Sequence, residues 1–309
     1  MRALAVLPCL VLVLACGEDP GAAVDAGRDA STARDAALDA PASPDAHVDA
    51  GLDAGSDAGP PRSAGCVDGA GLAEGEHTFE LEGRARRYVL RLPAGYTADR
   101  AWPLVLALHG NGGTTAYWDG TSGDRDIRSV LRDDAILIVA EAIGGDWRDY
   151  AMPADTWPAR LESELLYFDE VLSQARADLC VREDAIFAMG FSGGGSFSGV
   201  LACRRDDIRA IAVGGSVIYF DEAECVRKVA AWITIGTLEL NAGREQYRDF
   251  FRDLAGCEAT SSSTDPSPCV AYEGCDPATP VHYCQHPGDH VWPDFGSEAM
   301  WSFFQQQLE

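Results

Sequence analysis

Ala185-Ile-Phe-Ala-Met-Gly-Phe-Ser-Gly-Gly194 is the stretch of sequence that decides the fold. Its first five residues form a short apolar run, typical of a strand that is buried on both faces. A serine flanked by glycines follows, and the residues after it have helical spacing. A serine at such a strand-to-helix junction predicts a sharp turn that exposes its hydroxyl. We therefore expect Ser192 to be a nucleophile; the alternatives are a plain glycine-rich turn or a phosphate loop, but the chain has no GxxxxGK[ST] pattern.

Strand-like and helix-like segments alternate on both sides of this junction. An alternating strand is predicted at Arg87–Leu92, buried strands at 104–108, 135–140, 185–189, 210–213 and 230–235, and a short strand at 280–283. Helical spacing recurs at 161–179, 194–203, 244–254 and 297–308. This alternation favours an α/β fold with a mostly parallel central sheet and helices on both faces. Residues 256–284 are polar and rich in cysteine, and they predict a long insertion held by disulfides.

A serine nucleophile needs a histidine base, and the histidine must lie downstream in this kind of fold. Only His282, His286 and His290 follow Ser192. His290 lies in a loop after the strand at 280–283 and before the last helix, which is the position that the base requires. His282 falls within the strand, and His286 is the alternative base.

The histidine in turn needs a carboxylate to orient it. The strand at 230–235 runs into Gly236-Thr-Leu-Glu239, which puts Glu239 in the loop where that acid belongs. The competing carboxylates follow the preceding strand and are Asp221, Glu222 and Glu224. We favour Glu239.

An acyl transfer also needs hydrogen-bond donors for a developing oxyanion. His109-Gly-Asn-Gly-Gly113 follows the strand at 104–108, where a loop supplies one backbone amide. We assign that donor to Asn111 and the second to Gly193. Residues that could contact a substrate are His109, Trp147 and Trp292.

Together these motifs resemble the polyhydroxybutyrate depolymerase and feruloyl esterase family, a carbohydrate-esterase-like branch of the α/β-hydrolases. The similarity runs from about Arg87 to Phe304 through Arg87–Pro93, Pro103–Gly110, Gly190–Gly194, Gly236–Glu239 and His290-Val-Trp-Pro293. The resemblance implies an α/β-hydrolase fold and hydrolysis of carboxylic esters of polymers or their fragments, of the polyhydroxyalkanoate, feruloyl or acetyl type. It also implies an acyl-enzyme and no metal or organic cofactor. The chain departs from the family in having a glutamate where an aspartate is usual.

Two other functions remain open at this stage. One is a serine peptidase on the same fold, and the other is a surface binding domain that has lost the chemistry. A complete set of candidate catalytic groups favours the esterase over the second.

The first 64 residues differ in composition from the rest. Residues 1–16, MRALAVLPCLVLVLAC, resemble a lipoprotein signal that is cleaved before Cys16, whose sulfur then carries lipid. Residues 17–64 hold ten acidic residues and three arginines among Ala, Gly, Ser and Pro, and so predict a disordered linker. The catalytic domain is expected at 65–309. We predict an exported protein, held at an outer membrane or cell surface only by the lipid or released as a secreted protein.

The formal net charge of −25 gives no basic stripe for phosphate contacts, so we expect no nucleic-acid partner. Eight cysteines lie in the predicted domain: Cys66, Cys180, Cys203, Cys225, Cys257, Cys269, Cys275 and Cys284. An even number in an exported chain predicts disulfides, with 105 possible pairings. Zinc is the rival, but the cysteines show no CxxC spacing.

Overall fold

The computed structural model describes residues 59–309, apart from residues 150 and 226. The predicted signal at 1–16, its Cys16 and most of the predicted linker lie outside the described residues. The remaining residues carry every candidate catalytic group.

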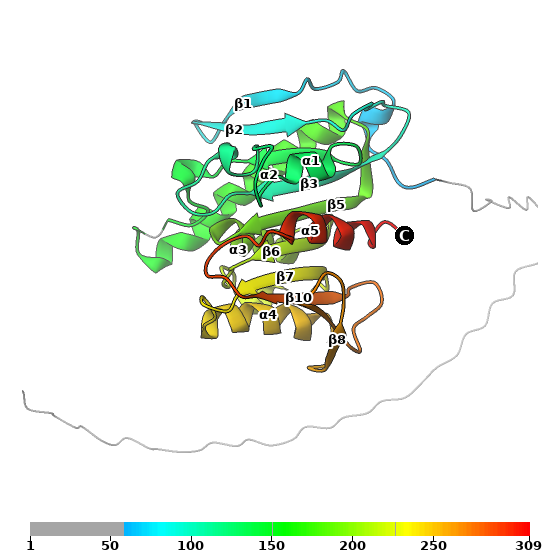
Figure 1. The fold of residues 1–309 in the computed structure, drawn as a ribbon. Helices are drawn as coiled ribbons and strands as arrows, with labels where there is room; N and C mark the ends of the chain where they lie inside the picture. Colours follow the sequence, from blue (N-terminus) through cyan, green and yellow to red (C-terminus); the bar gives the residue numbers. More distant parts are fainter. Residues whose placement is uncertain (1–58, 150, 226) are drawn as a thin grey trace, which may run out of the picture. The chain divides into compact units, whose positions relative to one another are not determined.

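Ten strands form a single sheet in the order β1-β2-β4-β3-β5-β6-β7-β10-β9-β8 (Figure 1). The strands are β1 (Gly75–Leu81), β2 (Arg84–Arg91), β3 (Trp102–Leu108), β4 (Ile136–Ala140), β5 (Val181–Phe191), β6 (Ile208–Gly214), β7 (Ala230–Gly236), β8 (Ser261–Ser263), β9 (Cys269–Tyr272) and β10 (Val281–His286). Neighbours from β4 to β10 pair in parallel, whereas both edges of the sheet are antiparallel. The carboxyl ends of six strands therefore meet at one edge.

Helices cover both faces of this sheet. They are α1 (Ile127–Leu131), α2 (Trp157–Asp178), α3 (Gly193–Arg204), α4 (Ala242–Leu254) and α5 (Gly296–Gln305), with short 3-10 turns at Ala64–Cys66, Thr115–Tyr117, Ile143–Gly145, Ala154–Thr156 and Glu222–Glu224. Alternate residues of each central strand face opposite cores, because successive side chains of a strand point to opposite sides. One core joins the sheet to α2, α3 and α4, and the other joins it to α1 and α5.

The predicted α/β-hydrolase architecture is confirmed. Each predicted strand and helix has a counterpart, and the buried strands β3, β4 and β7 have no exposed residue along their length. Among the strands and α-helices, β1, α1, β8 and β9 were not predicted. The segment 256–284 is not a continuous loop, because β8 and β9 form a hairpin that extends the sheet beyond β10.

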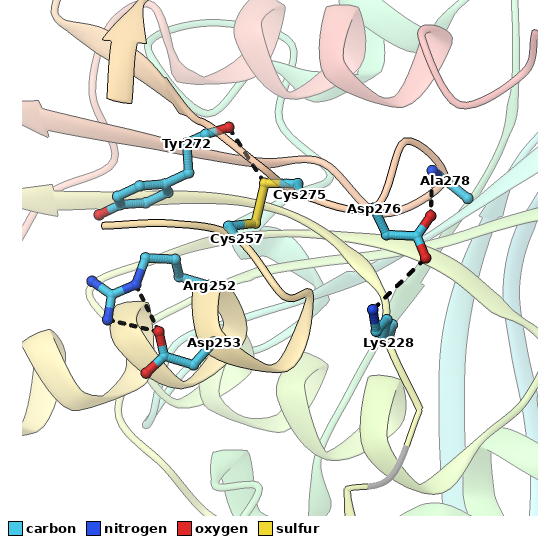
Figure 2. Close-up of a disulfide and its surroundings, with 8 residues drawn as sticks. All are labelled: Lys228, Arg252, Asp253, Cys257, Tyr272, Cys275, Asp276 and Ala278. Carbon is cyan, nitrogen blue, oxygen red and sulfur yellow. Dashed lines mark hydrogen bonds and ion pairs between the residues drawn. A yellow bond between two sulfur atoms is a disulfide. The ribbon is translucent and has the colours of Figure 1, made fainter. Parts of the chain in front are cut away.

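The eight cysteines form four disulfides, as their even number predicted. The pairs are Cys66–Cys180, Cys203–Cys225, Cys257–Cys275 and Cys269–Cys284. Figure 2 shows the third of these, which links the segment after α4 to the segment that follows β9. Beside it, the Asp276 carboxylate lies 3.7 Å from Lys228 and accepts a hydrogen bond from the Ala278 amide. Four disulfides indicate a protein that folds in an oxidising compartment outside the cytoplasm.

Packing of the chain onto the domain begins a few residues before the predicted boundary at residue 65. The Ser63 amide donates to the carbonyl of Val181, and the Glu183 amide donates to the carbonyl of Pro61. The buried Ser63 hydroxyl donates to the Leu179 carbonyl. The start of the domain is thus fixed to the amino-terminal end of β5. Among the described helices, none is long and apolar enough to cross a membrane.

Candidate active site

Ser192 occupies a sharp turn between β5 and α3. Its backbone has φ 56° and ψ −119°, a conformation that non-glycine residues rarely adopt. Such strain persists only where the surroundings hold it, and it is concentrated at functional sites. Here the Ser192 amide donates to the Gly214 carbonyl at 2.7 Å, which ties the turn to the end of β6. The side chain is half-buried at the carboxyl edge of the sheet.

The glycines around Ser192 permit this turn because backbone segments pass very close together. A Cβ atom at Gly194 would lie 2.1 Å from the carbonyl oxygen of Leu108, at the end of β3. The start of α3 therefore packs directly on the strand that leads to the Asn111 loop. This contact explains physically why small residues flank the predicted nucleophile.

His290 and Glu239 lie together, as the sequence predicted. His290 Nδ1 and Glu239 Oε2 form a short hydrogen bond. The two loops that carry them are joined by the Thr237 amide, which donates to the His286 carbonyl at 2.8 Å, and by the Leu238 amide, which donates to the Gly288 carbonyl. The acid and the base are thus held by one network of backbone bonds.

The Glu239 carboxylate is buried and has defined partners on both oxygens. The Gly236 amide donates to Oε1 at 3.0 Å, and Arg244 Nε lies 2.7 Å from Oε2. Burial alone raises the pKa of Glu239, but the hydrogen bonds from His290 and Gly236 and the charge of Arg244 outweigh it and hold that pKa below its ordinary value. The group is therefore ionised at neutral pH, as an orienting acid must be.

The imidazole of His290 stands over the segment that carries the nucleophile. Its ring lies 4.5 Å from the ring of Phe191, the residue before Ser192. Within the described part of the chain, the Ser192 hydroxyl makes no hydrogen bond. The hydrogen bond between a catalytic hydroxyl and its histidine base is often long or poorly aligned in an enzyme without substrate, and it tightens when substrate binds.

The two predicted oxyanion donors come from the start of α3 and from the loop after β3. Gly193 begins α3, and the amides of a first helical turn have no partner within the helix. The Asn111 amide also makes no hydrogen bond within the described part of the chain, whereas the Gly112 amide donates to the Gly145 carbonyl and to Asp146 Oδ1. The Asn111 side chain lies against Gly193, because a Cβ atom there would stand 1.9 Å from Asn111 Oδ1. The two predicted oxyanion donors are therefore neighbours.

Three residues that we expected to contact a substrate are instead buried. His109 and Trp147 have no exposed surface, and Trp292 is 3% exposed. Trp147 Nε1 donates to the His109 carbonyl, and the Ala142 amide donates to His109 Nε2, so His109 Nδ1 carries the proton that it shares with the Gly110 carbonyl. Burial lowers the pKa of His109, which keeps it neutral. His109 and Trp147 support the loop that carries Asn111, whereas Trp292 packs against Trp118, Phe191 and Trp232. The expectation of direct contact with substrate is corrected.

The alternative acids and bases are engaged elsewhere. The Asp221 carboxylate accepts the Ala223 amide, while Glu222 accepts a hydrogen bond from Gln246 and Glu224 pairs with Arg204. His282 lies in β10 and packs edge-on against Phe303 of α5. His286 is only 3% exposed, and its Nδ1 accepts the Gly288 amide. None of these arrangements resembles the His290–Glu239 pair.

Two residues of the site were missed from the sequence. Arg244 reaches both Glu239 and His290, and its Nη2 lies 3.2 Å from His290 Nδ1. Gly215 follows β6 and leaves space beneath the imidazole. A glycine after a buried strand was a visible signal for the second, but nothing local marks an arginine in the first turn of a helix as part of a site.

The fold and the site define the class of protein as an α/β-hydrolase. A solved structure of a ferulic acid esterase from Anaeromyces mucronatus, in complex with ferulic acid, aligns with 77% of this chain and 92% of its own at a TM-score of 0.55 and 13% identity. An S-formylglutathione hydrolase from Agrobacterium tumefaciens aligns with 75% of this chain and 94% of its own at a TM-score of 0.52 and 11% identity. These likenesses establish the fold.

Sequence relatives give a narrower likeness. Feruloyl esterase D of Neurospora crassa is 28% identical over 254 residues, which is 74% of this chain and 82% of the relative. Feruloyl esterase C of Emericella nidulans is 26% identical over 266 residues, 78% of this chain and 90% of the relative. No family model matches the chain. The resemblance to feruloyl esterases is thus confirmed, and the chain is a carboxylic-ester hydrolase.

Proposed function

We propose that the chain is an exported serine esterase that hydrolyses carboxylic esters of polymers or their fragments through Ser192, His290 and Glu239. The observation that carries this proposal is the pair formed by His290 and the ionised Glu239 above the strained turn of Ser192. Base, acid and nucleophile come from three different loops at the same edge of the sheet. Such convergence is the arrangement that acyl transfer needs.

In this mechanism, the Ser192 hydroxyl attacks the ester carbonyl while His290 Nε2 takes its proton. Glu239 accepts a hydrogen bond from His290 Nδ1–H and stabilises the imidazolium that forms. The amides of Asn111 and Gly193 bind the oxyanion of the tetrahedral intermediate, which collapses when His290 returns the proton to the leaving alcohol. Water then attacks the acyl-serine, again with His290 as base, and releases the carboxylic acid.

For the acyl group, the sequence relatives favour a feruloyl ester over a polyhydroxyalkanoate or acetyl ester.

For the location, the signal-like sequence at 1–16 and the four disulfides support export, and Cys16 is the proposed lipidation site. Metabolic labelling with a palmitate analogue tests the anchor. The full chain should be labelled and the Cys16→Ser variant should not. Equal labelling of the two would remove the anchor from the proposal.

An ester panel tests the activity. The full chain and Ser192→Ala are assayed on acetyl and butyryl p-nitrophenyl esters, methyl ferulate, polyhydroxybutyrate and peptide anilides. We expect ester turnover that Ser192→Ala abolishes, with methyl ferulate the best substrate by kcat/KM. Turnover of anilides alone would favour the peptidase.

A fluorophosphonate probe addresses the remaining alternative, an inactive binding domain. The probe should label the wild type at Ser192 and leave the alanine variant unlabelled. An unlabelled wild type that also fails on every ester would favour the inactive domain.

A further inference from the structure

Arg244 lies in the first turn of α4, directly after the loop that carries Glu239. The Asn241 side chain caps this helix by accepting the amides of Gly243 and Arg244, which fixes the start of α4. The Arg244 side chain is only 17% exposed. It is therefore held at the site, unlike an arginine that extends freely into solvent.

The guanidinium contacts both partners of the orienting hydrogen bond. Nε lies 2.7 Å from Glu239 Oε2, and Nη2 lies 3.2 Å from His290 Nδ1. Arg244 Nε makes no hydrogen bond of good geometry, so the guanidinium attracts the Glu239 carboxylate mainly through its opposite charge. At His290 the effect is the reverse, because a fixed positive charge opposes the formation of an imidazolium.

The other groups near His290 do not offset this charge. On its own loop, Asp289 is exposed and Asp294 follows four residues later. His286, at the end of β10, is buried and its pKa is lowered by burial, so it is neutral at pH 7. Glu239 is the carboxylate bonded to the ring. Glu239 and Arg244 are therefore the two charged side chains in direct contact with the ring.

We infer that Arg244 is a positioning residue with two effects: it anchors the long side chain of Glu239 against His290, and its charge opposes a second positive charge on the imidazole ring. The inference rests on the proposed function. A glutamate is one methylene longer than the usual aspartate, so its carboxylate has more conformations to lose. The Gly236 amide fixes one of its oxygens and Arg244 fixes the other. The site thereby compensates for the departure from the family pattern.

The test compares pH profiles of kcat/KM for methyl ferulate in the wild type and in Arg244→Gln. Removing the charge should move the acid limb to higher pH, because imidazolium then forms more readily. Loss of the anchor should also lower kcat about tenfold, while KM changes less than about twofold. Arg244→Lys should keep the acid limb near its wild-type position and lower kcat by a smaller factor.

Arg248→Gln is the matched control. It removes the same charge from the next turn of α4, where the arginine pairs with Asp249. Both kcat and the acid limb should match the wild type. Thermal unfolding of all variants separates folding from catalysis, and Arg244→Met replaces Arg244→Gln if the latter does not fold.

The inference is overturned if a folded Arg244→Gln or Arg244→Met retains the wild-type acid limb, or if Arg248→Gln moves it equally. These results would leave the proposed function intact as long as the wild type depends on Ser192. An inactive wild type, by contrast, counts against the proposed function itself.

Discussion

Gly215 lies directly beneath the imidazole of His290. A Cβ atom at this position would stand 2.7 Å from Cε1 and Nδ1 of the ring and 3.1 Å from Glu239 Oε2. The Gly215 amide donates to the Thr234 carbonyl, so the residue cannot easily move away. Because φ is +59°, a larger residue would also be strained in the backbone. Because Gly215 has no side chain, the His290 ring can pack directly on the backbone at the end of β6.

Gly215→Ala should therefore displace His290 and lower kcat/KM by roughly 100-fold, since a shift of about 1 Å at a catalytic group has that effect. Gly95→Ala is the control, because Gly95 has a φ of +74° and a methyl group added there would meet nothing within 4 Å. The control should lose about 1 kcal/mol of stability and no activity. Kinetics and thermal unfolding of both variants provide the check. Full activity in Gly215→Ala would show that the base does not need this position.

Glu239→Gln should reduce kcat by roughly 10³- to 10⁴-fold, because an amide can neither fix the reactive tautomer nor stabilise imidazolium as a carboxylate does. Glu239→Asp keeps the charge but shortens the reach to His290 and should lose less. Steady-state kinetics on p-nitrophenyl butyrate decides this. If the loss in Glu239→Gln were only severalfold, the orienting role would pass to another carboxylate, with Asp221 the first to examine.

The disulfides should differ in their contribution to stability. Removing Cys66–Cys180, which spans 114 residues, should cost about 5 kcal/mol in the free energy of unfolding. Removing Cys257–Cys275, which spans 18 residues, should cost about 3 kcal/mol. Denaturant unfolding of the two double Cys→Ser variants measures the difference. Equal losses would mean that native-state strain or residual structure in the unfolded chain outweighs loop entropy.

Acid should destabilise the protein in two steps. Burial lowers the pKa of His282 and His286, so their contribution is present above the ordinary value of 6.5 and is lost as pH falls towards the lowered folded values. The pKa of Glu239 is also lowered, so its contribution is present above the ordinary value of 4.5 and is lost at more acidic pH. The melting temperature should fall below about pH 6 and fall again below about pH 4. In Glu239→Gln the second fall should be smaller; an unchanged second fall would assign it to other carboxylates.

Short-range patterns in the sequence were enough to predict the parallel strands of the sheet and the loops that carry Ser192, Glu239 and His290. Each follows a predicted strand, and each of these strands can be recognised from the length and apolarity of its own short segment. The hairpin of β8 and β9 was read as a loop because β8 consists of three exposed serines and β9 has only four residues, of which Cys269 alone is fully buried. The full burial of Trp147 and the reach of Arg244 depend on distant segments that pack together, and no local pattern encodes them.

The attachment of residues 61–63 to the start of β5 has a geometric consequence for access to the nucleophile. Ser63 bonds to Val181 at one end of the strand, and Ser192 follows its other end. Eleven residues of strand span on the order of 30 Å. The chain therefore joins the described domain at the end of β5 that lies opposite the nucleophile. An attachment through this end would leave the edge that carries Ser192 open to an ester substrate.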